Sequence, residues 1–403
     1  MPPPDREGVP EGFIWGTATS AHQVEGGNWN SDWWAWEHAA ESPCVEPSGD
    51  ACDHYNLYPH DLDLLADLGF DAYRFSIEWA RIEPEEGEFS TAQLEHYRRV
   101  LAACRERGLA AFVTFHHFTL PRWVARLGGW HDPATAERFA RYCERATQRL
   151  GDLMTAGCTI NEPNIVARLG YEAGLFPPGL TDTTACARAS EVFVEAHQRA
   201  RDVIAEHTVD IPIGLTLAMS DYQAVDGGEA RRDQIRARRE DIFLEAARND
   251  DFIGVQTYTR ARVGPEGELG AEEGIETTLM GYEFWPDALE ATIRRAWDVT
   301  RHTPIVVTEN GIAAADDDRR VAFVQRALTG VRRALSDGIH VRGYFYWSAL
   351  DNFEWTYGYG PTFGLVAVDR STQERSPKPS AEWLGRVARS GRWPDIQPQL
   401  EKG

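Results

Sequence analysis

The chain has 403 residues, with 42% hydrophobic side chains, 26% charged side chains and a formal net charge of −22. So acidic a protein repels phosphate groups and anionic lipid, which argues against nucleic acid or a membrane surface as its partner. Lysine occurs only at positions 378 and 402, and neither follows a strand-like run. The sequence therefore lacks the strand-end lysine of a Schiff-base aldolase, the imine lysine of a pyridoxal enzyme and the lysine of a P-loop.

Short runs rich in β-branched and aromatic residues alternate along the chain with amphipathic stretches rich in Ala, Arg and Glu. The short runs are predicted to be strands, and they span residues 13–20, 72–79, 110–118, 153–162, 211–219, 251–259, 303–310 and 342–350. The amphipathic stretches are predicted to be helices, and they span residues 91–108, 134–150, 183–207, 231–248, 286–300 and 318–337. A last helix follows Lys378, where Ser380 is expected to cap its start.

Strand-then-helix units in one uninterrupted chain favour a closed parallel barrel. No linker or repeat divides the sequence, so we predict a single (β/α)8 TIM barrel domain over residues 1–403. The alternative is a doubly wound open sheet, which usually carries a G-x-G-x-x-G turn after its first strand. Here that position reads AHQVEGGNWN (21–30), which does not match.

Polar side chains gather where the predicted strands end, and in such barrels the chemistry lies at the carboxyl ends of the strands. The third, fourth, sixth and seventh strands end in His116-His117, Asn161-Glu162, Gln256-Thr257-Tyr258 and Glu309-Asn310. Carboxylates that face a pocket cost desolvation energy, so several at one mouth indicate a site rather than packing.

Glu162 and Glu309 end the fourth and seventh strands and face one mouth. Glycosidic bonds are cleaved by such a pair, in which one carboxylic acid protonates the leaving oxygen and a carboxylate attacks or supports the anomeric carbon. A separation of about 5–5.5 Å implies retention of configuration, and a wider one implies inversion. We expect the charge of Glu309 to raise the pKa of Glu162, which keeps Glu162 protonated as the acid.

The flanking segments carry a family resemblance. Five segments agree in order: FIWGTATSAHQVEGG (13–27), YRFSIEWARI (73–82), TINEPN (159–164), VTENG (307–311) and YWSALDNFEWTYGYGPTFGL (346–365). Together they resemble the β-glucosidases of glycoside hydrolase family 1, over nearly the whole chain from Phe13 to Lys378. The resemblance implies a (β/α)8 barrel and retaining hydrolysis, with Glu162 as acid/base and Glu309 as nucleophile.

The resemblance also implies a sugar-binding set, which consists of Gln23, His117, Asn161, Trp347, Glu354 and Trp355. Asn161 would hold the 2-hydroxyl, Glu354 and Trp355 the 3-, 4- and 6-hydroxyl side, and Trp347 would form a platform. Arg74 and Tyr258 would lie next to Glu309 and keep it ionised. Sugars need fork-like polar groups and aromatic faces, so these residue types agree with the chemistry.

Three features depart from the family pattern. Phe118 stands where a tryptophan is usual, and Gln256-Thr257 replaces the usual Asn-Tyr before Tyr258. The connection between Arg260 and Trp285 is short, which predicts a wider mouth that admits bulky aglycones. Candidates for aglycone contacts are Trp33, Trp34 and Trp123.

The loop after the eighth predicted strand narrows the class of sugar that we expect as the substrate. Relatives specific for phosphosugars carry Ser and Lys there, whereas this chain has Glu354 and no lysine in that loop. A carboxylate would repel a phosphate. We therefore expect an unphosphorylated gluco-, galacto- or fuco-configured β-glycoside as the substrate.

Three rival functions remain open from the sequence. A metal-dependent hydrolase is disfavoured because the side chains of His116 and His117 point to opposite faces of one strand. A non-catalytic sugar-binding barrel should have lost a catalytic glutamate, and both are present. A transglycosylase would use the same residues with an acceptor hydroxyl in place of water.

Features outside the site indicate the cellular compartment of the protein and whether it carries a metal. The six cysteines are scattered without a C-x-x-C pair, so no thiolate zinc site is indicated. The starting segment MPPPDREG lacks the apolar region of a secretion signal. We expect a cytoplasmic protein with free thiols, no metal and no cofactor. No feature of the sequence indicates an oligomeric state.

Overall fold

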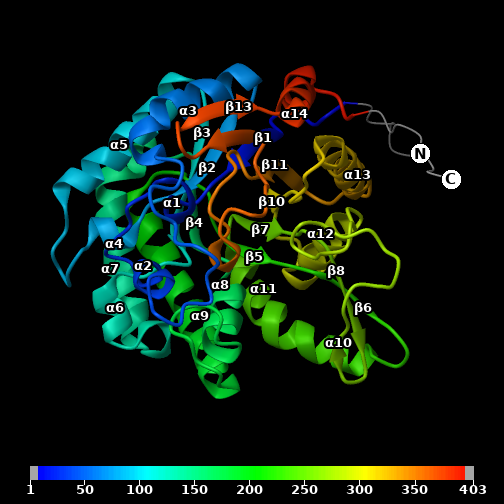
Figure 1. Ribbon diagram of the computed structural model, residues 1–403, viewed down its shortest axis with the longest axis horizontal. Coiled ribbons are helices and arrows are strands. Elements are labelled where there is room, and N and C mark those ends of the chain that lie inside the picture. The colour runs from blue at the N-terminus through cyan, green and yellow to red at the C-terminus, as the bar shows by residue number, and fades with distance from the viewer. Residues whose placement is uncertain (1–7, 395–403) are drawn as a thin grey trace.

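The computed structural model describes residues 8–394, so Lys402 and most of the starting segment lie outside the described residues. Eight parallel strands close a barrel in the order β1-β11-β10-β7-β5-β4-β3-β2 (Figure 1). These strands are β1 Ile14–Ala18, β2 Ala72–Ser76, β3 Ala110–His117, β4 Ala156–Asn161, β5 Ile213–Ala218, β7 Phe252–Gln256, β10 Ile305–Asn310 and β11 Val341–Trp347. Every predicted strand is confirmed, and the barrel replaces the open-sheet alternative.

The barrel interior is filled by side chains and is not a pore. Its lower layer is an apolar cluster of Ala72, Phe112, Ala156, Cys158, Phe252, Val306 and Phe345. The rings of Phe112 and Phe345 lie 4.8 Å apart between centroids. The interior next to this layer has little free space, and a small residue is needed at Gly254. A Cβ at that position would lie 2.5 Å from Thr216 Cγ2 and 2.6 Å from Thr308 Oγ1.

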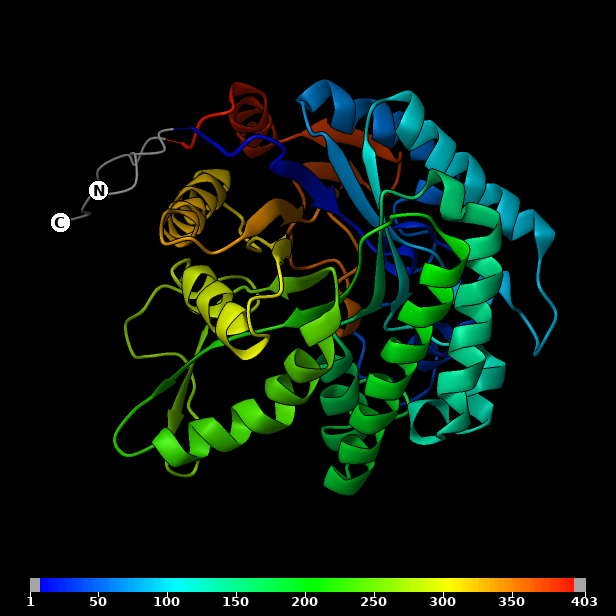
Figure 2. The ribbon, with the colours of Figure 1, turned by 180° about the vertical axis from the view of Figure 1, so that it is seen from behind.

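Helices surround the barrel, as the view from behind shows (Figure 2). They are α3 His54–Leu68, α5 Thr91–Glu106, α7 Ala134–Leu150, α9 Thr183–His207, α10 Glu229–Arg236, α11 Ile242–Ala246, α12 Ala288–Val299, α13 Asp317–Ser336 and α14 Pro379–Ser390. The predicted helix 231–248 is present but is interrupted by a π-helical segment, Ala237–Asp241. Helix α3 was not predicted.

The predicted cap of the last helix is wrong. Lys378 occupies the N-cap position of α14, and Ser380 is the second residue of the helix, where its hydroxyl donates to Asp317 at 2.8 Å. A serine that reaches a carboxylate on α13 cannot also cap its own helix, so Ser380 fastens α14 to α13 instead.

Smaller elements lie outside the barrel. One sheet joins β6 Asp221–Ala224, β8 Arg260–Gly264 and β9 Gly267–Glu268, and β12 Val366–Asp369 pairs with β13 Glu374–Pro377. Short helices follow several barrel strands, namely α1 Ala21–Val24, α2 Asp32–Glu37, α4 Trp79–Ile82, α6 Arg122–Arg126 and α8 Pro163–Val166. All six cysteines are unpaired. Within residues 8–394, no helix combines the length and the apolar character that crossing a membrane requires.

Candidate active site

Glu309 is the penultimate residue of β10, and both of its carboxylate oxygens accept hydrogen bonds. Arg74 Nη1 donates to Oε1 at 2.7 Å, and the Tyr258 hydroxyl donates to Oε2 at 2.6 Å. Tyr258 follows β7, the neighbour of β10, whereas Arg74 is fully buried on β2, which β11 and β1 separate from β10 in the barrel. Burial raises the pKa of Glu309, whereas the Arg74 charge and the two hydrogen bonds lower it. Arg74 and Tyr258 thus lie where the sequence predicts, and they stabilise the ionised form.

Glu162 follows β4 and begins helix α8. Its side chain is 8% exposed, and no hydrogen bond to its carboxyl group is made by any residue in the range 8–394. Burial raises the pKa of Glu162 well above its usual range, and the negative charge of Glu309 raises it further. Arg74 acts in the opposite direction but does not contact Glu162.

The two carboxyl groups therefore differ in their partners. Burial raises the pKa of both carboxyl groups. Only Glu309 accepts hydrogen bonds from the Arg74 guanidinium and the Tyr258 hydroxyl, which lower its pKa in turn. One proton shared by the pair consequently resides on Glu162. An ionised Glu309 beside a protonated Glu162 is the arrangement that retaining glycoside hydrolysis needs.

Polar sugar-binding candidates surround this pair. Asn161 precedes Glu162, and its amide nitrogen lies 3.2 Å from His117 Nε2. Gln23 Nε2 donates to the Phe353 carbonyl at 2.7 Å and to Glu354 Oε2 at 3.4 Å. The structure thus brings Gln23, on α1, together with Glu354, in the loop after β11, as one recognition group.

Aromatic rings form the walls of the site. The His117 ring stacks on Trp347 at 5.7 Å and on Trp355 at 6.1 Å between centroids. Trp355 is also stacked on His22 at 5.5 Å and contacts Phe118 at 4.8 Å. Phe118 therefore retains the packing of an aromatic residue at this position but contributes no N–H donor.

Three residues of the site have a strained backbone conformation. Phe118, Glu162 and Trp355 have φ values of 71°, 46° and 53°, in the left-handed region that side chains other than glycine rarely adopt. Such conformations cost free energy and persist where the surroundings fix them, often at functional sites.

The tryptophans expected to contact an aglycone are dispersed. Trp33 is buried against Trp355 and Phe176, with ring centroids 4.6 and 4.7 Å away. Trp123 packs on Trp79, and its Nε1 donates to the Glu83 carbonyl at 2.9 Å. These contacts hold both rings within the protein interior, and their contact with an aglycone stays a prediction.

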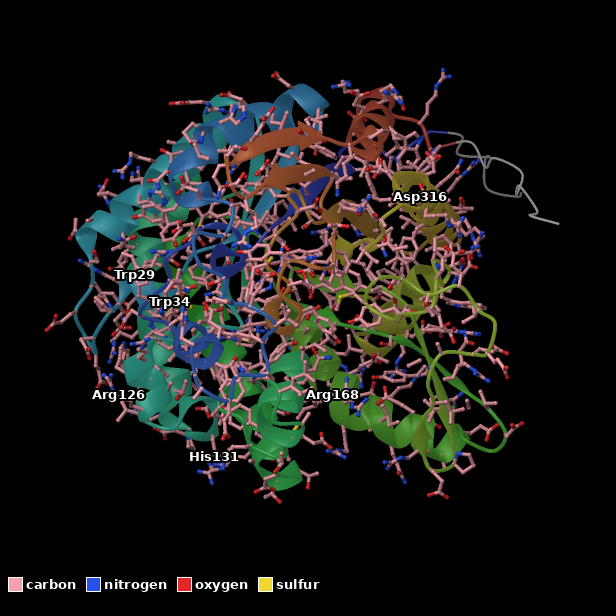
Figure 3. All side chains as sticks on the ribbon, viewed as in Figure 1. Trp29, Trp34, Arg126, His131, Arg168 and Asp316 are labelled. Carbon is pink, nitrogen blue, oxygen red and sulfur yellow. The ribbon has the colours of Figure 1, made fainter. Side chains whose placement is uncertain are left out.

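Trp34 lies elsewhere. It is half-buried on α2, at the side of the molecule that also carries Arg126 (Figure 3). Its ring stacks on His38 at 4.4 Å. His38 lines a cavity beside the site, so Trp34 remains a candidate at the rim.

That cavity, of about 670 Å³, opens between α2, α6 and the segment after α8. Its walls are mostly apolar and include Trp36, Phe118, Leu120, Val166, Tyr171 and Pro178. Phe118 also contacts Trp355, and Val166 belongs to the helix that begins at Glu162. The cavity is therefore connected to the site through Phe118 and helix α8, but neither Glu162 nor Glu309 lines it. Trp36 lines this cavity, whereas Trp33 and Trp123 do not, and it is a further aromatic candidate on this side.

Two residues that hydrogen-bond to predicted site residues were not predicted from the sequence. Thr216 on β5 donates to Asn161 Oδ1 at 3.1 Å, and Ser20 donates to Gln23 Oε1 at 2.7 Å. A signal was present for Thr216, because a lone polar residue interrupts the apolar strand IGLTLA. Ser20 follows β1 without a comparable signal.

Comparison with known proteins agrees with this geometry. The model of glycosyl hydrolase family 1 matches residues 5–254 and 246–392. β-Glucosidase A of Thermotoga maritima is 31% identical, with 94% of this chain and 98% of the relative covered. Thermostable β-glucosidase B of Thermobispora bispora is 34% identical over 94% of this chain and 90% of its own.

Solved structures are also similar. The crystal structure of β-glycosidase BGL167 has a TM-score of 0.89 at 50% identity, covering 97% of this chain and 99% of the other. The β-glucosidase of Thermotoga maritima in complex with glucoimidazole has a TM-score of 0.90 at 29% identity, with 96% and 100% covered.

The barrel, the paired carboxyl groups and these matches define a glycoside hydrolase. The chain belongs to glycosyl hydrolase family 1, whose members are retaining β-glycosidases. A non-catalytic sugar-binding barrel is thereby set aside.

Proposed function

We propose that this enzyme hydrolyses unphosphorylated β-glucosides in two displacement steps, with Glu309 as nucleophile and Glu162 as acid/base. In the first step Glu309 attacks the anomeric carbon, the glycosidic C–O bond breaks, and Glu162 gives its proton to the leaving oxygen. The observation that carries this proposal is the unequal pair: Glu309 is held by Arg74 and Tyr258, while Glu162 has no such partner.

The second step reverses the role of Glu162. Once Glu309 is a glycosyl ester, its negative charge is gone, and that charge is one cause of the raised pKa of Glu162. The pKa of Glu162 falls, and its carboxylate takes a proton from water as the water attacks the anomeric carbon. The ester bond to Glu309 breaks, and the sugar leaves with its original configuration.

The carboxyl group of Glu354, which is mostly protonated below about pH 8, suits the hydroxyl groups of an unphosphorylated sugar. Its carboxyl group is held by Gln23, and burial together with the Glu309 charge raises its pKa to about 8. Lys378 is the one lysine in the described range, and it is occupied by Asp351 and the Gly364 carbonyl at 2.8 Å each. No lysine is thus left to bind a sugar phosphate beside Glu354.

The aglycone is proposed to extend toward the 670 Å³ cavity beside Phe118. Its apolar walls favour a bulky, flat aglycone over a second sugar. The relatives are named glucosidases and glucohydrolases, which favours water over an alcohol as the acceptor. We further propose that the whole chain is one catalytic domain and that the enzyme acts in the cytoplasm.

Two substitutions test the assignment of roles. Glu309→Ala should abolish hydrolysis, and azide should partly restore turnover and give the α-glycosyl azide, because azide attacks the face that Glu309 has vacated. Glu162→Ala should spare dinitrophenyl glucoside, whose leaving group needs no proton, far more than an alkyl glucoside. A β-azide from the first variant, or equal losses on both substrates in the second, would contradict the roles. A panel of nitrophenyl β-glycosides measures the preference for gluco over galacto or fuco configuration.

A further inference from the structure

The amide of Asn161 is fixed by three donors from three different strands. Its Oδ1 accepts from Arg74 Nη2 at 2.5 Å, from Gln256 Nε2 at 2.9 Å and from Thr216 Oγ1 at 3.1 Å. A guanidinium can only donate, so the atom that faces Arg74 is the amide oxygen. The NH2 group of Asn161 therefore faces away from Arg74 and lies on the side of His117.

One of the two N–H bonds of that NH2 group donates to a histidine of the protein. Asn161 Nδ2 lies 3.2 Å from His117 Nε2. Burial and the charge of Arg74 lower the pKa of His117 well below its usual range, so the ring is neutral and its Nε2 can accept. The second N–H has no acceptor among residues 8–394 and is free for a substrate hydroxyl.

Gln256 is placed to hold this orientation. It ends β7, between Ala218 of β5 and Glu309 of β10 in the barrel register, and it is fully buried. Its Nε2 is bonded to Asn161, whereas its Oε1 is buried without a partner. An unsatisfied buried carbonyl costs stability. A hydrophobic residue would avoid that cost but would lose the donor to Asn161.

We propose that Gln256 is a positioning residue, which orients Asn161 so that its free N–H donates to the 2-hydroxyl of the sugar in the transition state. The inference rests on the proposed function, in which Asn161 binds that hydroxyl. Arg74 sets which way the amide points, and Gln256 with Thr216 restrains it laterally. Gln256 itself touches neither the substrate nor the reacting atoms.

The test compares Gln256→Met with the parent enzyme on nitrophenyl β-D-glucoside and on its 2-deoxy counterpart. Methionine keeps the length of the side chain and removes both polar atoms. We expect kcat/KM to fall about tenfold on the glucoside, the effect of one buried hydrogen bond. On the 2-deoxy substrate the loss should be about twofold or less. The thermal midpoint should be unchanged or higher, because the orphaned Oε1 is gone.

Two further variants make the outcome specific. Asn161→Ala is the benchmark and should also lose activity selectively on the glucoside. Thr257→Val is the matched control at the end of the same strand, because its hydroxyl bonds Thr292 on α12 at 2.7 Å rather than the site. It should affect both substrates alike.

Equal losses of Gln256→Met on both substrates, with a selective loss in Asn161→Ala, would overturn the role of Gln256 and leave the proposed function intact. If Asn161→Ala were itself unselective, the role of Asn161 in the proposed function would fail, and the inference with it.

Discussion

Tyr258→Phe removes a single hydrogen bond from the proposed nucleophile. The Tyr258 hydroxyl donates to Glu309 Oε2 at 2.6 Å, and Glu309 is 3% exposed. A hydrogen bond to a charged group contributes about 1.5–3 kcal/mol. This bond favours the ionised form and lowers the pKa of Glu309, so its loss should raise that pKa.

The assay is the pH dependence of kcat/KM, which reports ionisations of the free enzyme. Since about 1.4 kcal/mol corresponds to one pH unit, the acid limb of the profile should move to higher pH by about one pH unit or more. The substrate should carry a dinitrophenyl leaving group, so that protonation by Glu162 does not limit the rate. Tyr142→Phe is the control, because this buried hydroxyl bonds only the backbone carbonyls of Ile77 and Phe115. An acid limb that stays in place, or moves to lower pH, would refute the reasoning.

Three other predictions follow from the structure. Gly254→Ala should lower the free energy of unfolding by about 1–3 kcal/mol in chemical denaturation, because its Cβ would lie 2.5 Å from Thr216 Cγ2; an unchanged midpoint would contradict the tight contact. Because burial raises the pKa of Glu354 to about 8, its carboxyl group ionises above that pH; KM for the glucoside should therefore change between about pH 7 and pH 9, and Glu354→Gln should remove that change. No group of three or more His, Cys, Asp or Glu side chains suited to a metal occurs in residues 8–394, so dialysis against EDTA should leave kcat/KM unchanged.

The barrel was predictable because its signal is local. Each strand is a short apolar run, and the polar residues that end it mark the mouth. Helix α3 was missed because Pro59 and several polar residues weaken its amphipathic pattern. The interrupted helix at 237–241 could not be foreseen, since a π-helical turn depends on packing rather than on composition.

The site was predictable to the extent that its residues lie at strand ends. Arg74, Tyr258 and Glu309 meet as expected. Helices α2 and α6 are too short for a periodic pattern to show which ring faces the cavity. The sequence therefore did not single out Trp36, and it did not show that Trp33 and Trp123 are buried. The three donors on Asn161 come from β2, β5 and β7, so their meeting also needed the folded barrel.

Trapping the glycosyl-enzyme with a 2-deoxy-2-fluoro-β-glucoside that bears a good leaving group, followed by peptide mass spectrometry, measures the central step directly. Attack by a side chain on carbon predicts a stoichiometric sugar ester on the peptide that contains Val307–Gly311, at Glu309. An ester on any other residue, or turnover with no covalent species and with an inverted product, would contradict the account.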